Sequence, residues 1–242
     1  MTAVNQNIVN QIAPTGILRV GINLGNPILA GLDPSTKQPF GVSVDLAREL
    51  ANQLNINATF TSYQKASDTI DSLKNGDSDL IFVAIDPVRG KELAYSYAYI
   101  QIEGAYMVRD SSTISSNDSV DQVGTHIVVG KGSAYDLYLT RELKNATIVR
   151  ANSSQDVLDD FMNSNHEVAA GVKQQLEMDA KRYNNLRMLP GRFMVINQAM
   201  AVAKNRTIAA EYLNSFIQQM KESKFIQGSL INHNIQGATV AE

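Results

Sequence analysis

An arginine with the chemistry to bind a carboxylate, Arg89, lies within the most informative stretch of the chain, Asp79–Tyr99. The preceding run Leu80–Ile85 is continuously apolar, as a strand that is buried on both faces requires. Pro87 ends this strand and, with Asp86 as N-cap, favours the first turn of a helix. Arg89 therefore follows the carboxyl end of a buried strand, where α/β proteins bind ligands, and its guanidinium offers a planar, two-pronged donor. The alternative is an arginine that pairs with a neighbouring acid for structural reasons.

Further polar residues follow other predicted strands. Gly132 and Ser133 precede a predicted helix, where a turn glycine and a plain N-cap are the structural interpretation. Lys131 and Lys173 add positive charge after two strands, unless they are merely solvated flanks. Asn26 lies in a Gly/Pro loop that is expected to line the ligand site, or that simply shapes a turn.

Two aromatic residues and one isolated acid are weaker candidates. Phe82 and Tyr135 could stack on a ligand, although an aromatic side chain beside an apolar strand is more often part of the core. Glu103 stands alone within an apolar run, and we expect it to face the ligand or to pair with a cation. The segment 191–193, Gly-Arg-Phe, could reach the same site.

Composition excludes several classes of function. The 242 residues, 44% of them hydrophobic, can bury one large core or two modest ones, and a net charge of −3 gives no footprint for nucleic acid. Without cysteine there is no disulfide, and the three scattered histidines show no metal-ligand spacing. No nucleophile motif, P-loop or dinucleotide fingerprint is present, so neither catalytic residues nor a cofactor are predicted. No apolar run reaches the roughly 18 residues of a membrane helix.

The amino terminus bears on location. It lacks the basic and apolar regions of a secretory signal. The expected location is therefore periplasmic if the chain has been processed, and cytoplasmic if Met1 is the native start.

The hydrophobic pattern predicts two series of alternating strands and helices, separated by a polar stretch at residues 109–117. A final strand and an amphipathic helix are best assigned to the first series. We therefore predict lobe 1 at residues 1–108 plus 198–242 and lobe 2 at residues 109–197, with a hinge at 104–108. The predicted strands are 18–23, 57–63, 80–85, 126–129, 147–149, 168–172 and 198–203; the predicted helices are 46–54, one ending at 75–76, 134–143, 155–162, 174–182 and 207–223.

Four stretches carry a family resemblance: 16–22 (GILRVGI), 40–47 (FGVSVDLA), 79–99 and 128–134 (VVGKGSA). In this order they resemble the type II periplasmic solute-binding proteins of family 3, which serve polar amino-acid transporters. The resemblance implies a two-lobed α/β fold of the periplasmic-binding-protein-like II class, each lobe a sheet flanked by helices, with a hinge and a central cleft. It further implies a monomer that closes on a small solute and presents it to an ABC permease.

The resemblance also assigns roles. The family arginine that matches Arg89 binds the α-carboxylate of the solute, and the residue matching Ser133 adds hydrogen-bond donors. Phe82 and Ala84 stand where the family usually has small or hydroxyl residues, and Lys173 replaces the acid that pairs with the ammonium of the solute. Because a lysine repels an ammonium, we expect a carboxylate-bearing, anionic solute.

Three other functions remain open from sequence. The same clamp hosts enzymes of the cyclohexadienyl-dehydratase type, in which Glu103 or Asp86 would act as general acid. A cytoplasmic solute sensor would need no permease, and a scaffold that has lost ligand binding is the third reading. Fold cannot decide among them, because function resides in the site.

Overall fold

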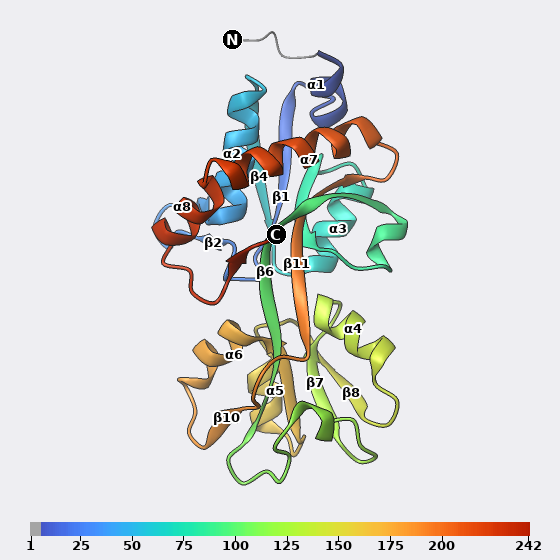
Figure 1. Ribbon diagram of the computed structural model, residues 1–242, viewed down its shortest axis with the longest axis vertical. Coiled ribbons are helices and arrows are strands. Elements are labelled where there is room, and N and C mark those ends of the chain that lie inside the picture. Colours follow the sequence, from blue (N-terminus) through green and yellow to red (C-terminus); the bar gives the residue numbers. More distant parts are fainter. Residues whose placement is uncertain (1–5) are drawn as a thin grey trace. The chain divides into compact units, whose positions relative to one another are not determined.

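The computed structural model describes residues 6–242, and the chain divides into two compact units (Figure 1). Unit 1 comprises the chain up to Gln101 together with Asn197–Glu242, and unit 2 comprises Ile102–Ile196. The chain thus first passes from unit 1 to unit 2 after Gln101, seven residues before the predicted break after Val108 (108 − 101 = 7). The cause is that β6 (Leu93–Arg109) is one continuous strand, and the polar stretch at 109–117 marks the end of this strand rather than the crossing.

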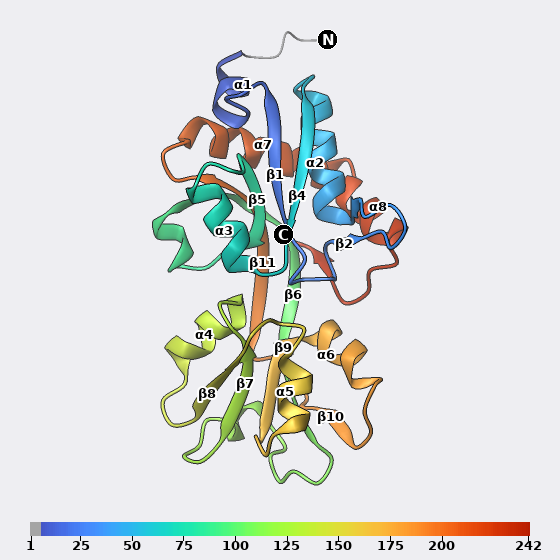
Figure 2. The same cartoon turned by 180° about the vertical axis from the view of Figure 1, so that it is seen from behind.

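The sheet of unit 1 has the strand order β4-β1-β5-β11, in which β4, β1 and β5 are parallel and β11 is antiparallel to β5. Since the connections β1→β4 and β4→β5 run in opposite directions, right-handed crossovers place α2 and α3 on opposite faces. The helix α7 lies in front of the strands in Figure 1 and behind them in Figure 2. The strands are β1 (Ile17–Asn23), β4 (Asn57–Tyr63), β5 (Leu80–Ala84), β11 (Met194–Ala203) and the short β2 (Gly31–Leu32), β3 (Pro39–Phe40) and β12 (Thr239–Val240); the helices are α1 (Gln6–Ile12), α2 (Val42–Gln53), α3 (Ala66–Lys74), α7 (Thr207–Glu222) and α8 (Phe225–Asn232).

The helical period of the sequence explains how α2 packs. Leu46, Ala47 and Leu50 recur at helical spacing and are fully buried, so one face of α2 forms part of the core of unit 1. Gly41 begins this helix with φ 114°, and a Cβ there would lie 2.5 Å from the carbonyl oxygen of Leu29. Only glycine fits this tight entry to the helix.

In unit 2 the strand order is β6-β9-β7-β8, with β7 parallel to both β8 and β9, and β6 antiparallel to β9. The connections β7→β8 and β8→β9 again reverse direction, which places α4 and α5 on opposite faces of this sheet. The strands are β7 (His126–Gly130), β8 (Thr147–Ala151), β9 (Val168–Val172) and β10 (Leu186–Met188), which pairs with β6; the helices are α4 (Ala134–Glu142), α5 (Val157–Asn163) and α6 (Lys173–Ala180).

Most predicted elements are confirmed, with ends that shift by a few residues. The helix expected after Pro87 is only a single 3₁₀ turn, Arg89–Lys91. The segment 104–108, predicted as a hinge, is strand, since Gly104–Met107 pairs with β9. Among residues 6–242, no helix combines the length and apolar content that a membrane span requires.

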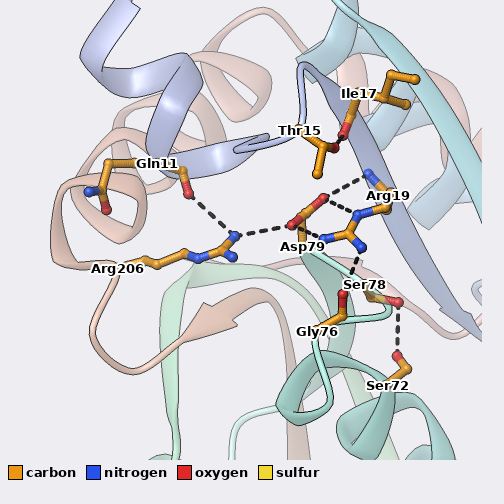
Figure 3. A network of polar contacts seen from close by, with 9 residues as sticks. All are labelled: Gln11, Thr15, Ile17, Arg19, Ser72, Gly76, Ser78, Asp79 and Arg206. Carbon is orange, nitrogen blue, oxygen red and sulfur yellow. Dashed lines mark hydrogen bonds and ion pairs between the residues drawn. The ribbon is translucent and has the colours of Figure 1, made fainter.

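A buried carboxylate fixes the amino-terminal edge of the sheet in unit 1 (Figure 3). The side chain of Asp79 is fully buried, and Arg19 donates to both of its oxygens from Nε and Nη2, each at 2.8 Å. A second guanidinium, of Arg206, lies 3.4 Å away and also donates to the carbonyl of Gln11. Because a buried carboxylate is stable only with partners, these contacts tie β1, β5, α1 and the start of α7 together.

Replacing Arg19 by methionine should lower the free energy of unfolding by about 3 kcal/mol, since it leaves the buried Asp79 side chain with only two longer contacts, to Arg206 and to the backbone N–H of residue 19. The matched control is Arg182→Met, which breaks an ion pair to Asp159 whose partners are both exposed. That change should cost less than about 1 kcal/mol. Urea unfolding followed by circular dichroism compares the two, and equal losses would show that Asp79 does not depend on Arg19.

Candidate functional site

Arg89 lies at the carboxyl edge of the sheet in unit 1, directly after β5. It is only 6% exposed, and its Nη1 donates to the carbonyl of Ala84 at 3.2 Å. The Asp86 carboxylate accepts the backbone N–H groups of Val88 and Arg89, which holds the turn. Burial lowers the pKa of the Arg89 guanidinium, while Tyr95 and Asp86 act in the opposite direction. A cation that pays for desolvation in this way gains from an anionic ligand.

The remaining candidates of unit 1 divide between this edge and the core. Since β1 and β5 are parallel neighbours, the loop after β1 that holds Asn26 emerges at the same edge of the sheet as Arg89. The Oδ1 atom of Asn26 is buried and meets no hydrogen-bond donor among the described residues. Phe82 instead packs edge-on against Tyr99, with ring centroids 5.9 Å apart, and belongs to the core.

At the carboxyl edge of unit 2, the turn 131–133 follows β7. Gly132 has φ 72°, and its N–H donates to the carboxylate of Asp136 at 2.8 Å. Ser133 is the N-cap of α4, where its hydroxyl accepts the backbone N–H of Asp136 at 3.1 Å. Lys131 is exposed. The hydroxyl oxygen of Ser133 thus accepts the N-cap hydrogen bond. The turn lies at the amino terminus of α4.

A buried acid and a buried tyrosine support this turn. The carboxylate of Asp136 also accepts the Nε of Arg150 at 3.0 and 3.1 Å, so it joins the turn to β8. The Tyr135 hydroxyl bonds Ser154, Ser133 and the backbone of Gly130, and burial raises its pKa. Tyr135 is therefore buried within unit 2, where its hydroxyl group supports the turn at residues 131–133 through these hydrogen bonds.

The most concentrated charge at this edge is a cluster of Glu103, Lys173 and Arg192. One Glu103 oxygen lies 3.3 Å from Lys173 Nζ, and the other accepts Arg192 Nη1 at 2.9 Å. The two cations lower the pKa of Glu103, with the hydrogen bond from Arg192 as the largest cause. At neutral pH the cluster therefore contains two positive charges and one negative charge.

Backbone pairing explains why these three residues meet. Gly104 of β6 pairs with Val172 of β9, so Glu103 and Lys173, the next residues along the two strands, are brought together. The N–H of Phe193 donates to the carbonyl of Gly104 at 2.9 Å, which brings Arg192 alongside. Phe193 also stacks on Tyr106, with centroids 4.3 Å apart.

Two supports of the site were not predicted from the sequence. Asp136 was detectable, because Ser133-Ala-Tyr-Asp136 has the spacing of a capping box. A cationic partner for Glu103 was one of the two alternatives expected from the sequence, but the identity of that partner as Arg192 had no local signal, since 89 residues separate the two. Within residues 6–242, no three His, Asp or Glu side chains are placed to hold a metal ion.

Asp136→Ala should lower the free energy of unfolding by about 1–3 kcal/mol, because the Gly132 N–H and the Arg150 guanidinium lose a buried acceptor. Hydrogen exchange at Gly132 should accelerate as well. Asp160→Ala, which removes an exposed acid from α5, is the control and should change neither quantity measurably. Unaltered exchange at Gly132 in the Asp136 variant would contradict this account of the turn.

Curated relatives match part of the chain. It is 28% identical over 148 residues to a membrane-bound lytic murein transglycosylase F of Salmonella arizonae, an alignment that covers 57% of this chain and 27% of that protein. It is 26% identical over 148 residues to an arginine-binding periplasmic protein of Mannheimia haemolytica, with 60% and 59% covered. The chain therefore spans less than two thirds of either relative.

A solved structure and a family model cover far more of the chain. The crystal structure of a solute receptor for L-cysteine from Neisseria gonorrhoeae superposes with a TM-score of 0.79 at 19% identity, covering 93% of this chain and 92% of that one. This likeness shows the fold. Residues 18–229 match the model of the bacterial extracellular solute-binding proteins, family 3. The chain belongs to this family of solute-binding proteins.

Proposed function

We propose that the protein binds a small, carboxylate-bearing solute with net negative charge and delivers it, as a monomer outside the cytoplasm, to an ABC permease. The observation that carries the proposal is the buried guanidinium of Arg89 at the carboxyl edge of unit 1. Arg89 is assigned a carboxylate, and the cations of unit 2 are assigned an anionic group. Each assignment rests on chemistry within its own unit.

The chemistry of unit 1 favours a carboxylate that is accompanied by a hydrogen-bond donor. A guanidinium binds a carboxylate through two parallel bonds, and such a bond is strongest where water is excluded. The buried Oδ1 of Asn26, at the same edge of the sheet, would accept a donor from the solute. Together the two groups suit a solute with an acid group and an N–H or O–H group.

The chemistry of unit 2 favours additional negative charge. Lys173 and Arg192 contribute two cations, of which Glu103 balances one. The remaining positive charge is attractive to an anion and repulsive to an ammonium. The helix amino terminus at Ser133 adds partial positive charge to the same edge of the unit.

An enzymatic role of the dehydratase type is less favoured by the carboxylates present. A general acid at neutral pH needs a raised pKa, whereas Arg192 and Lys173 lower the pKa of Glu103. Asp86 is occupied as the acceptor of two backbone N–H groups. Glu103 is therefore poorly suited to donate a proton, and Asp86 is engaged in holding the turn before Arg89.

Arg89→Ala should weaken the binding of the solute about 30-fold or more, because removing one partner of a buried charged contact costs about 2–5 kcal/mol. Arg89→Lys keeps the charge but loses the fork, so it should restore little of the affinity. The control Lys91→Ala removes an exposed cation two residues away. Calorimetry with a panel of amino acids and dicarboxylates measures this, and equal affinity in all three variants would assign Arg89 to structure.

Lys173→Asp should weaken an anionic solute and improve a zwitterion, since an aspartate reverses the sign of the local field. The same change at Lys181, an exposed residue that follows α6, alters net charge equally and should leave both affinities unchanged. Binding of a neutral amino acid by the unaltered protein, with no response to Lys173→Asp, would rule out the anionic solute.

A further inference from the structure

The carboxylate of Glu103 occupies the cations that the proposed function assigns to a solute anion. Its two oxygens are divided between Arg192 Nη1 and Lys173 Nζ, the arrangement that a bidentate carboxylate of a solute would adopt. All three side chains are partly exposed, at 30% for Glu103, 36% for Lys173 and 53% for Arg192. Solvent, and therefore a dissolved anion, reaches the cluster.

We propose that Glu103 is a specificity-determining residue that acts as an internal competitor, whose carboxylate is displaced from Lys173 and Arg192 by an anionic group of the solute. This inference rests on the proposed function, because it concerns the same anionic solute. The binding free energy of an anion is then a difference between two quantities. One is the free energy of its contacts with the two cations, and the other is the free energy lost when Glu103 leaves them.

The backbone holds Glu103 in place while its side chain can move. Glu103 lies in β6 beside Gly104, which pairs with Val172 and accepts the N–H of Phe193. Its two cationic partners also keep Glu103 ionised at neutral pH, since they lower its pKa. The competing carboxylate is therefore charged at neutral pH, and rotation of its side chain releases it from the cations.

The same charges argue against Glu103 as the acceptor of an ammonium group. A third cation would approach two existing ones, and the cluster already carries one excess positive charge. The energy of a charge near the surface depends on this sum rather than on the nearest acid alone. A solute is therefore selected for negative charge strong enough to displace Glu103, and a weakly charged ligand is excluded.

The test compares the unaltered protein with Glu103→Gln, which keeps the shape of the side chain and removes its charge. Calorimetry should use succinate, L-aspartate, L-glutamate, L-alanine and L-arginine, with thermal unfolding to verify the fold. The anionic probes that the protein binds should bind about tenfold more tightly to the variant, which corresponds to about 1.4 kcal/mol. The control is Glu177→Gln, which removes an exposed acid from α6 and should change no affinity.

Removing a cation from the same cluster separates competition from a general change of charge. In the Arg192→Met background, Glu103→Gln should produce a smaller gain for an anion, because one of the two contested partners is absent. If Glu103→Gln is unstable, Glu103→Asp takes its place, because it keeps the charge but shortens the side chain. Its affinity for an anion should lie between that of the unaltered protein and that expected for Glu103→Gln.

Each outcome has one meaning. Tighter binding of anions in Glu103→Gln, reduced by Arg192→Met, supports the competitor. Unchanged or weaker binding of anions, or a loss confined to L-alanine and L-arginine, overturns it and makes Glu103 a positioning residue or an ammonium acceptor. If no anion binds to either protein, the proposed function itself fails; if anions bind in an Arg89-dependent manner without a gain in Glu103→Gln, only the competitor fails.

Discussion

One buried carboxylate, Asp79, is the constraint on which the geometry of unit 1 depends. It lies at the amino-terminal end of β5, where Arg19 of β1 holds both of its oxygens and Arg206 approaches from the start of α7. The Asp79 N–H also donates to the carbonyl of Arg19. This fixes the register of the parallel strands β1 and β5, in which Val20 lies opposite Leu80, and because both strands run in the same direction, the loops of Asn26 and Arg89 emerge at a common edge.

In unit 2, the feature of interest is the balance of charges among three side chains at the carboxyl edge of its sheet. Lys173 replaces the acid that the family resemblance implies, and taken alone it would leave an uncompensated cation. Glu103, 3.3 Å away, supplies the missing negative charge from a different strand, and Arg192 returns the sum to positive. The net positive charge of this cluster thus depends on all three residues. The lysine at position 173 does not show it by itself.

The sequence predicted the fold well because its signals are local. The apolar run at β5, the helical period of α2 and the stop at Asn75-Gly76 each depend on neighbouring residues, and the structure confirms them. The predictions failed where the structure depends on pairing between strands that are distant in the sequence. A polar loop after β6 suggested a unit boundary, whereas the partner of each part of the strand decides where the crossing lies.

The candidate site was less predictable for the same physical reason. Arg89 could be located from the strand that precedes it, and Ser133 from the predicted helix that follows it. A continuous apolar run does not show which side chain reaches the edge, so Phe82 could not be assigned to the core before its contact with Tyr99 was known. The partners of Glu103 come from β6–β9 register and from one backbone hydrogen bond of Phe193, neither of which leaves a pattern in the chain.

The division of the chain has a consequence for biosynthesis. Unit 2 is one uninterrupted segment, whereas unit 1 requires residues from Asn197 onward. A nascent chain that ends at Ile196 contains every strand of unit 2, but β5 still lacks the β11 residues Gln198–Ala201, and Asp79 lacks Arg206. Unit 2 can therefore fold on the ribosome while β5 retains an open, apolar edge, which is the stage most exposed to aggregation and most suited to chaperone binding.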